Sequence, residues 1–385
     1  MAKITSINAR QILNSRGEPS LEVEIITDDG LLATDSVPTG TSAGNFEIVV
    51  VDPSRAVENI NRIIAPKIIG LNPIDQFEID QLLQDLNGQN DYKLGANATL
   101  GVSLVVSRVA SLTQKMPLYW YLNKLYEKIY GQSVEPSIPT PMMVMIEGGK
   151  HANNNICIQE FLVIGELLHG KKIWHALNEI LVQKEIPIKL GLEGGFAPKL
   201  NFDEDAIDLI LAATKLAKLN VPDQIKLGLD ITANHCGISL KDVLSLMDRY
   251  PIYSLEDPAP QDAWHHWAQM KLELDQKNRP YLLVGDDLFV TSSKRLEKGL
   301  NDFIANAIII KINQNSTLTE TLKLIAMAQK ANYTHILSHR SGETMDSFIA
   351  DLAVATAAKF LKAGAPLASE REIKYQRLVE IAKEL

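Results

Sequence analysis

Cysteine, basic residues and long apolar runs are all scarce in this chain of 385 residues. Its two cysteines, Cys157 and Cys236, are too few for the disulfide framework of a small secreted protein. No stretch approaches the roughly 18 uninterrupted apolar residues of a membrane-spanning helix, and the start MAKITSINARQ lacks the apolar core of a signal peptide. Lys and Arg number 38 against 47 Asp and Glu, and the net charge of −9 argues against binding to nucleic acid or an anionic membrane. We therefore expect a cytoplasmic globular protein with neither partner.

The first third of the chain mixes strand and helix patterns. Apolar residues alternate with acids in the second of three expected strands, as in a sheet with one buried and one solvent-exposed face. The strands are expected at 4–13, 20–27 and 31–37, and helices at 53–69, 74–86 and 96–114. Three prolines between 135 and 141 exclude a helix there. We therefore place an α+β N-terminal domain at 1–134 and a second domain at 135–385.

The second domain alternates short apolar runs with helical stretches. Five runs end in a polar residue, at 225–230, 252–257, 281–287, 307–311 and 335–338. Their ends are about 25 to 30 residues apart, the length of one strand, one helix and two loops. Continuous apolar strands indicate a sheet buried on both faces. The spacing favours an α/β fold with a (β/α)8-type TIM barrel, although an open parallel sheet has the same spacing.

Three of these runs end in an acid, namely Asp230, Glu256 and Asp286. In a barrel, the C-terminal strand ends form one face, so the three carboxylates would converge and repel one another. A hard divalent cation such as Mg²⁺ would neutralise them. Each acid alone could equally cap the following helix. Their occurrence in three consecutive units favours a metal site.

The next two runs end in groups that suit an anionic substrate. Lys311 follows four buried-type residues, and a lysine buried beside a metal can have its pKa lowered enough to act as a base. The alternative is an ordinary surface lysine. The following run leads into Ser338–Glu343, which offers a guanidinium, hydroxyls and backbone N–H groups for a carboxylate or phosphate. This combination indicates abstraction of a proton next to a carboxylate.

Eight motifs in order make the chain resemble the enolases from near residue 3 to near residue 385. They are Asn14–Gly17, Gly95–Ala98, His151–Ala152, Ile158–Phe161, Glu193–Pro198, Val284–Leu288, Lys311–Gln314 and Ser338–Thr344. Enolases are phosphopyruvate hydratases, hydro-lyases that convert 2-phosphoglycerate reversibly to phosphoenolpyruvate in glycolysis. A lysine base acting with Mg²⁺ is already known for this superfamily.

The resemblance implies a role for each matching residue. Asp230, Glu256 and Asp286 match the ligands of a first Mg²⁺, and Ser42 in a mobile lid matches a ligand of a second Mg²⁺ that arrives with substrate. Lys311 matches the base that removes the C2 proton, and Glu193 the acid that helps the C3 hydroxyl to leave. The other matching residues surround the substrate: Glu160, Lys362 and His151 as catalytic groups, and Gln159, His339, Arg340 and Ser341 as binding groups.

Two further expectations follow from this resemblance. Glu193 needs a raised pKa to be protonated, and burial against Glu160 is the expected cause. Enolases associate through the N-terminal domain, so we expect a homodimer or a larger homo-oligomer. On local chemistry alone, Ser42, His151 and Glu193 would be ordinary turn or loop residues.

The chain also departs from the family pattern. It is shorter, and seven residues differ around the lid and the site: Thr39, Ala43, Val144, Glu147, Lys150, Leu192 and Ala368. Glu147 stands in place of an asparagine and Leu192 in place of an aspartate. Two alternatives therefore stay open, namely an enolase-fold paralogue acting on another phosphorylated acid and a non-catalytic binding or scaffolding protein.

Overall fold

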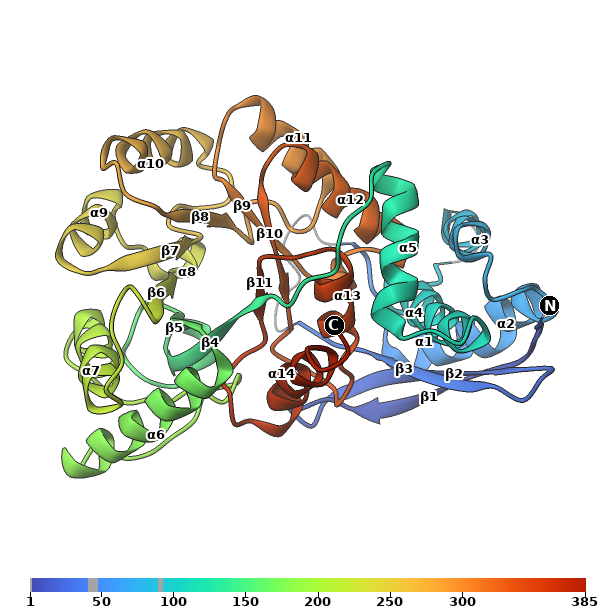
Figure 1. Ribbon diagram of the computed structural model, residues 1–385, viewed down its shortest axis with the longest axis horizontal. Coiled ribbons are helices and arrows are strands. Elements are labelled where there is room, and N and C mark those ends of the chain that lie inside the picture. Colours follow the sequence, from blue (N-terminus) through green and yellow to red (C-terminus); the bar gives the residue numbers. More distant parts are fainter. Residues whose placement is uncertain (1, 41–47, 89–92) are drawn as a thin grey trace.

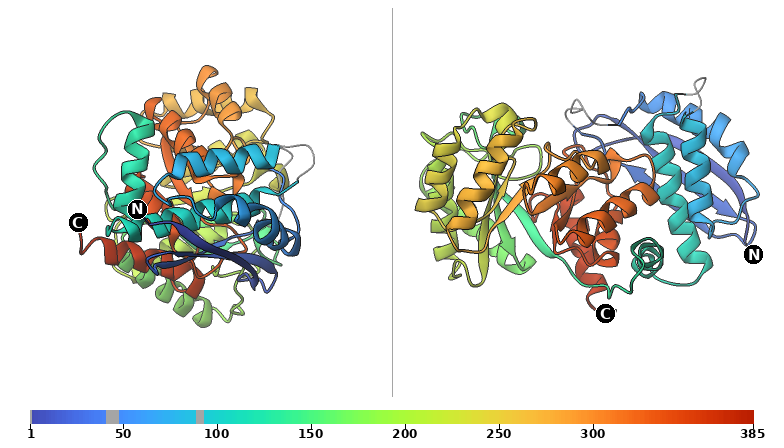
Figure 2. Two further views of the ribbon diagram at one scale, coloured as in Figure 1. Left: turned by 90° about the vertical axis from the view of Figure 1, so that its right-hand side faces the viewer. Right: turned by 90° about the horizontal axis from the view of Figure 1, so that it is seen from above.

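The computed structural model describes residues 2–40, 48–88 and 93–385. Its two parts lie side by side along the long axis, the N-terminal sheet and helices next to a closed barrel (Figures 1 and 2). The last helix of the first part ends at Tyr130, and the first barrel strand begins at Thr140. The division at 134/135 stays a prediction.

The N-terminal sheet has three antiparallel strands in the order β1 (Ile4–Leu13), β2 (Pro19–Thr27) and β3 (Leu32–Val37). Leu21, Val23 and Ile25 are buried, as the alternation in the sequence predicts. Leu21 and Val23 pack against Gly101 so closely that a Cβ there would lie 3.0 and 2.9 Å from them. The helix that carries Gly101 therefore covers the dry face of the sheet.

Six helical segments accompany the sheet in the described residues of this part. They are α1 (Pro53–Asn59), the π-helical turn η1 (Ile60–Ile64), α2 (Ala65–Ile68), α3 (Gln76–Gly88), α4 (Ala96–Thr113) and α5 (Leu118–Tyr130). Asp52 caps α1 by accepting a hydrogen bond from the backbone N–H of Ser54 at 2.9 Å. The predicted helix 53–69 is therefore present but contains a π-helical turn.

The second part is a closed barrel of eight strands, which confirms the predicted fold class. The strands are β4 (Thr140–Glu147), β5 (Glu160–Gly165), β6 (Ile225–Asp230), β7 (Ile252–Glu256), β8 (Leu282–Gly285), β9 (Ala307–Ile310), β10 (Thr334–Ser338) and β11 (Phe360–Lys362). Strands β6 to β10 match the five predicted apolar runs. Alternate side chains such as Val144, Leu162 and Ile309 fill the interior as a separate apolar cluster.

The barrel differs from a regular parallel barrel at β5, which is antiparallel to both β4 and β6. A loop with one 3₁₀ turn, η2 (Gly149–His151), joins β4 to β5 without a crossover helix. A strand reached without a crossover returns in the opposite direction. Two helices then precede β6, which runs parallel to β7.

The helices of the barrel part surround the strands (Figure 1). They are α6 (Leu167–Gln183), α7 (Asp203–Leu216), α8 (Ala233–Cys236), α9 (Leu240–Arg249), α10 (Trp264–Gln276), α11 (Ser293–Asn301), the 3₁₀ turn η3 (Ile312–Gln314), α12 (Leu318–Lys330), α13 (Phe348–Ala355) and α14 (Ser369–Ile381). Within the described part of the chain, none of the helices has the length and apolar character needed to cross a membrane.

The two parts meet beside the end of β10. The backbones of Thr39 and Gly342 exchange two hydrogen bonds of 2.8 and 2.9 Å. The N–H of Ser15 donates to the carbonyl of Glu343 at 2.7 Å. Thr39, shortly after β3, is thereby held next to the segment that follows β10.

The two cysteines form one disulfide, Cys157–Cys236, across 79 residues of sequence. The sequence count excluded a disulfide framework but could not exclude this single bond, because only the fold brings the loop before β5 next to α8. The number of cysteines did not predict this bond. Such bonds are uncommon among proteins of the reducing cytoplasm.

Candidate active site

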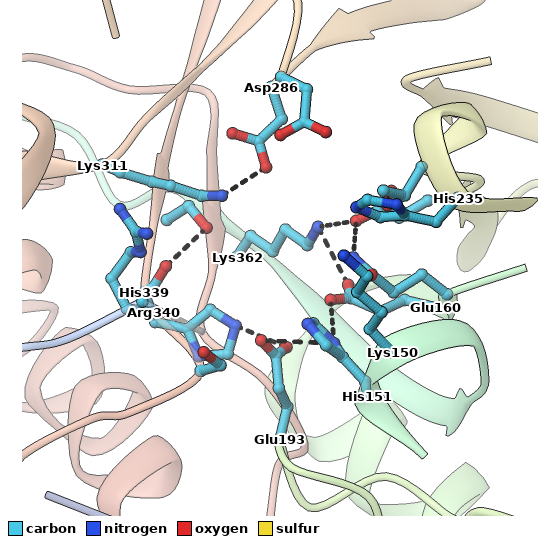
Figure 3. Close-up of a pocket in the computed structure, with 17 residues that line it drawn as sticks. Lys150, His151, Glu160, Glu193, His235, Asp286, Lys311, His339, Arg340 and Lys362 are labelled. Carbon is cyan, nitrogen blue, oxygen red and sulfur yellow. Dashed lines mark hydrogen bonds and ion pairs between the residues drawn. The ribbon is translucent and has the colours of Figure 1, made fainter. Parts of the chain in front are cut away.

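A polar pocket opens at the C-terminal strand ends of the barrel (Figure 3). Its lining is Gly40, Lys150, His151, Gln159, Glu160, Glu193, Asp230, Thr232, His235, Asp286, Asp287, Lys311, Ser338, His339, Arg340, Ser341 and Lys362. The predicted site residues are all in this lining except two. Glu256 is buried and reaches the site through Lys362, and Ser42 lies outside the described residues.

The barrel brings these residues together from separate strands. Glu160 begins β5, Asp230 ends β6 and Glu256 ends β7, whereas Lys362 ends β11 on the far side of β4. Asp286 follows β8 and Lys311 follows β9. Because the parallel strands end at one face, a lysine 132 positions from Asp230 in sequence contacts it directly.

Two lysines form ion pairs with the three predicted metal ligands. The ammonium of Lys362 lies 3.0 Å from Asp230 and 2.9 Å from Glu256. The ammonium of Lys311 donates to Asp286 (Figure 3). The three predicted ligands do not form one of the tight metal-ligand groups found among the described residues, in which all ligand atoms lie within 4.8 Å of one another. The two such groups are His151 with Glu160 and Glu193, and Asp257 with Asp286 and Asp287.

The donor set nevertheless suits a divalent cation. Burial, followed by repulsion from Asp230, raises the pKa of Glu256 well above its ordinary value despite Lys362. Burial also raises the pKa of Asp230, but Lys362 and the hydroxyl of Thr232 together bring it below its ordinary value. The strand ends therefore hold more carboxyl groups than Lys362 can balance. Oxygen donors with excess negative charge are the ligands that hard cations prefer.

The pKa of Lys311 is shifted in the opposite direction from the predicted one. Burial lowers it, but the Asp286 carboxylate outweighs burial, and the pKa lies above its ordinary value. Lys311 is thus protonated while Asp286 is its ion-pair partner. The sequence placed the lysine correctly but not this contact.

A second cluster surrounds Glu193 at the other side of Lys362 (Figure 3). Nδ1 of His151 lies 3.2 Å from Glu160 and 3.7 Å from Glu193. Nε2 of His339 lies 2.8 Å from the other oxygen of Glu193. Burial lowers the pKa of His151, yet Glu193 and Glu160 raise it to about 9, so this imidazole is charged near neutral pH.

The electrostatics of this cluster correct the prediction for Glu193. Burial raises the pKa of Glu193, but His339 and His151 bring it well below its ordinary value. The neighbouring Glu160 has the raised pKa instead, because burial and the Glu193 charge outweigh Lys362. His151 is therefore the charged partner in this cluster, and Glu193 does not have the raised pKa that the sequence predicted.

Two guanidinium groups lie where the pocket meets the N-terminal part, Arg340 in the lining and Arg16 in contact with the lining residue Ser341. Nη1 of Arg16 donates to the Ser341 hydroxyl at 2.9 Å. Nη1 of Arg340 donates to the Asn313 amide oxygen at 2.8 Å. Arg340 and Ser341 line the pocket. This arrangement suits a phosphate or carboxylate.

Sequence reasoning missed two buried residues that organise this site. Arg371 on α14 donates to the carbonyls of Arg340, Ser341 and Leu192 and so joins two site loops. Glu147 at the end of β4 contacts the turn that carries Glu193. Arg371 gave no sequence signal, whereas Glu147 was visible as a departure from the family pattern.

Fold and site together define a barrel enzyme with acids, lysines and guanidinium groups gathered at its C-terminal strand ends. The family model described as "Enolase, N-terminal domain" matches residues 4–122, and the model described as "Enolase, C-terminal TIM barrel domain" matches residues 135–238 and 234–385. The chain belongs to the enolase family, a family of lyases that use a divalent metal ion.

Proposed function

We propose that this chain catalyses the reversible, Mg²⁺-dependent dehydration of 2-phosphoglycerate to phosphoenolpyruvate. The observation that carries the proposal is the placement of Lys311 and Glu193 on different sides of one polar pocket, with Lys362 between them (Figure 3). A substrate bound there would present C2 to one group and the C3 hydroxyl to the other. Arg340 and Ser341 would hold the phosphate.

The first step would be removal of the C2 proton by the neutral amine of Lys311. The electron pair left behind enters the carboxylate and gives it a second negative charge. Lys362, fully buried beside Asp230 and Glu256, places an ammonium where this charge develops. A divalent cation held by Asp230, Glu256 and Asp286 would stabilise the same charge and take Asp286 away from Lys311.

The second step would be loss of the C3 hydroxyl as water. Hydroxide is a poor leaving group, so Glu193 would have to deliver a proton while the C2–C3 double bond forms. Because the pKa of Glu193 itself is low, the charged His151 at 3.7 Å is the nearest donor that can protonate it. Glu160 would exchange protons with His151 at 3.2 Å.

The decisive experiment follows the ultraviolet absorbance of phosphoenolpyruvate after mixing the protein with 2-phosphoglycerate and millimolar Mg²⁺. We expect a rise that disappears with a chelator and in Lys311→Ala. Lys323→Ala, which removes an exposed lysine of α12, serves as the matched control and should keep the activity. A flat trace from folded, Mg²⁺-loaded protein would overturn the proposal and leave another phosphorylated acid or a binding role as the alternatives.

Partners and location follow from the same proposal. We infer a small phosphorylated substrate, a homodimer or larger homo-oligomer, and a place in the cytoplasm. The second Mg²⁺ would arrive with the substrate at Ser42. The retained phosphate-binding pair Arg340 and Ser341 supports a phosphorylated substrate over a plain acid.

A further inference from the structure

Glu147 places a completely buried carboxyl group under the turn that carries Glu193. It is the last residue of β4 and is 0% exposed. Its Oε1 accepts hydrogen bonds from the backbone N–H groups of Gly195 at 2.6 Å and Glu193 at 3.2 Å. Its Oε2 accepts from the same Glu193 N–H at 3.0 Å. One side chain thus accepts from the backbone N–H of Glu193 itself and from that of Gly195, two residues further along the turn.

The rest of the turn is fixed by backbone contacts. The Gly191 N–H donates to the Gly195 carbonyl at 2.9 Å and closes the turn. The Glu193 carbonyl accepts from the N–H of Ala365 at 2.9 Å. The peptide groups on both sides of Glu193 are therefore held, one by Glu147 and the other by the loop after β11.

The glycines of the turn make room for this carboxyl group. A Cβ on Gly191 would lie 2.5 Å from Cδ and Oε2 of Glu147, and a Cβ on Gly195 would lie 3.1 Å from Oε1. A side chain at Gly191 would therefore displace the Glu147 carboxyl group, and one at Gly195 would press on it. The turn and the acid therefore form one unit.

Burying a carboxyl group beside other carboxyl groups costs free energy, because its charged form is desolvated and repelled. Burial and the charge of Glu193 raise the pKa of Glu147 to about 8, although His151 and the Glu193 N–H act against them. Oε2 of Glu147 is also 4.0 Å from Nδ1 of His151. An apolar side chain at this position would avoid that cost but would leave the N–H groups of Glu193 and Gly195 without their acceptor.

We propose that Glu147 is a positioning residue that aims the Glu193 carboxyl at the leaving hydroxyl by holding the backbone of its turn. The inference rests on the proposed function. Two departures from the family pattern meet in this turn, since an acid stands at 147 and Leu192 stands where the family has an aspartate. In this chain, the carboxylate that accepts from the turn comes from the end of β4.

The test separates the two chemical steps. Exchange of the C2 proton of 2-phosphoglycerate with deuterium from solvent reports the Lys311 step, and formation of phosphoenolpyruvate reports the Glu193 step. In Glu147→Ala we expect dehydration to slow at least tenfold more than C2 exchange, with little change in KM. Glu147→Gln keeps an oxygen for both N–H groups and should recover most of the loss.

A second readout does not depend on activity. Amide hydrogen exchange of residues 191–196 should be at least tenfold faster in Glu147→Ala than in the unmodified chain, and close to normal in Glu147→Gln. The matched control is Asp80→Asn, which alters another buried acid that accepts a backbone N–H, from Thr319 at 3.0 Å, far from the pocket. It should change neither the ratio of the two steps nor this exchange.

Equal loss of both steps in Glu147→Ala, or unchanged amide exchange in the turn, would overturn the inference. Failure of the proposed function is distinguishable, because the unmodified chain would then form no phosphoenolpyruvate while the amide-exchange result would still report whether Glu147 holds the turn.

Discussion

Arg371 donates a hydrogen bond from Nη1 to Nδ1 of His339 at 2.8 Å, and this contact decides which nitrogen of His339 carries a proton. A guanidinium is a donor only, so Nδ1 must accept and the proton must lie on Nε2. Nε2 is the atom 2.8 Å from Glu193. Burial lowers the pKa of His339 to about 4, with Arg371 adding to the effect and Glu193 opposing it. His339 therefore faces Glu193 as a neutral N–H group.

Replacing Arg371 should disturb both this histidine and the fold. In Arg371→Lys, the ammonium cannot donate to Nδ1 and to three carbonyls at once, because it lacks the planar fork of the guanidinium. We expect the His339 pKa to move up from about 4, as read by NMR of the imidazole, and the free energy of unfolding to fall by about 3 kcal/mol. Arg377→Lys on the same helix, which breaks a bidentate pair with Asp351, is the control and should leave the histidine unchanged. An unshifted His339 in Arg371→Lys would contradict the assignment.

The raised pKa of His151 should make stability depend on pH. Its pKa is about 9 in the fold against 6.5 unfolded, so its contribution is complete below about pH 6.5 and is lost as the pH rises through 9. The shift corresponds to at most about 3 kcal/mol. Urea unfolding of the unmodified chain and of His151→Gln across this range should give curves that converge at alkaline pH. A constant difference would show that His151 is neutral in the fold.

A divalent cation should stabilise the fold through the strand-end acids. Mg²⁺ at 100 times its dissociation constant should add about 2.7 kcal/mol to the free energy of unfolding, seen as a higher melting temperature. Asp230→Asn should abolish the rise. The control is Asp287→Asn, which changes the neighbouring cluster, where Asp287 accepts a hydrogen bond from the Asn234 amide at 2.8 Å. This variant should still show the rise in melting temperature. The reverse result would place the cation in the Asp257–Asp286–Asp287 cluster.

The disulfide should be detectable and stabilising. We expect no free thiol to react with a thiol reagent in denatured, unreduced protein. Cys157→Ser should lower the free energy of unfolding by about 2 to 4 kcal/mol, since the bond closes a loop of 79 residues in the unfolded chain. Cys236→Ser removes the same bond and should lower the free energy of unfolding by the same amount. Two reactive thiols would show that the bond does not form.

The sequence predicted the elements of the fold because their patterns are local. Leu21, Val23 and Ile25 alternate with acids in a half-buried strand, and the run Ala307–Ile310 is uniformly apolar in a strand buried on both faces. The antiparallel direction of β5 was not predicted, because it depends on whether the connection from β4 to β5 contains a crossover helix. The strand β11 was missed because Phe360–Lys362 is only three residues long.

By itself, the sequence determined which residues are available for the chemistry, since a carboxyl, an amine or a guanidinium is a property of each residue and the motifs keep their order. The tertiary structure decided which of these side chains contact one another. Asp286 sets the charge of Lys311, two histidines set that of Glu193, and Glu147 reaches its turn across 46 residues. These effects act through space over a few ångströms and depend on burial, so they exist only once the barrel has brought its strand ends together.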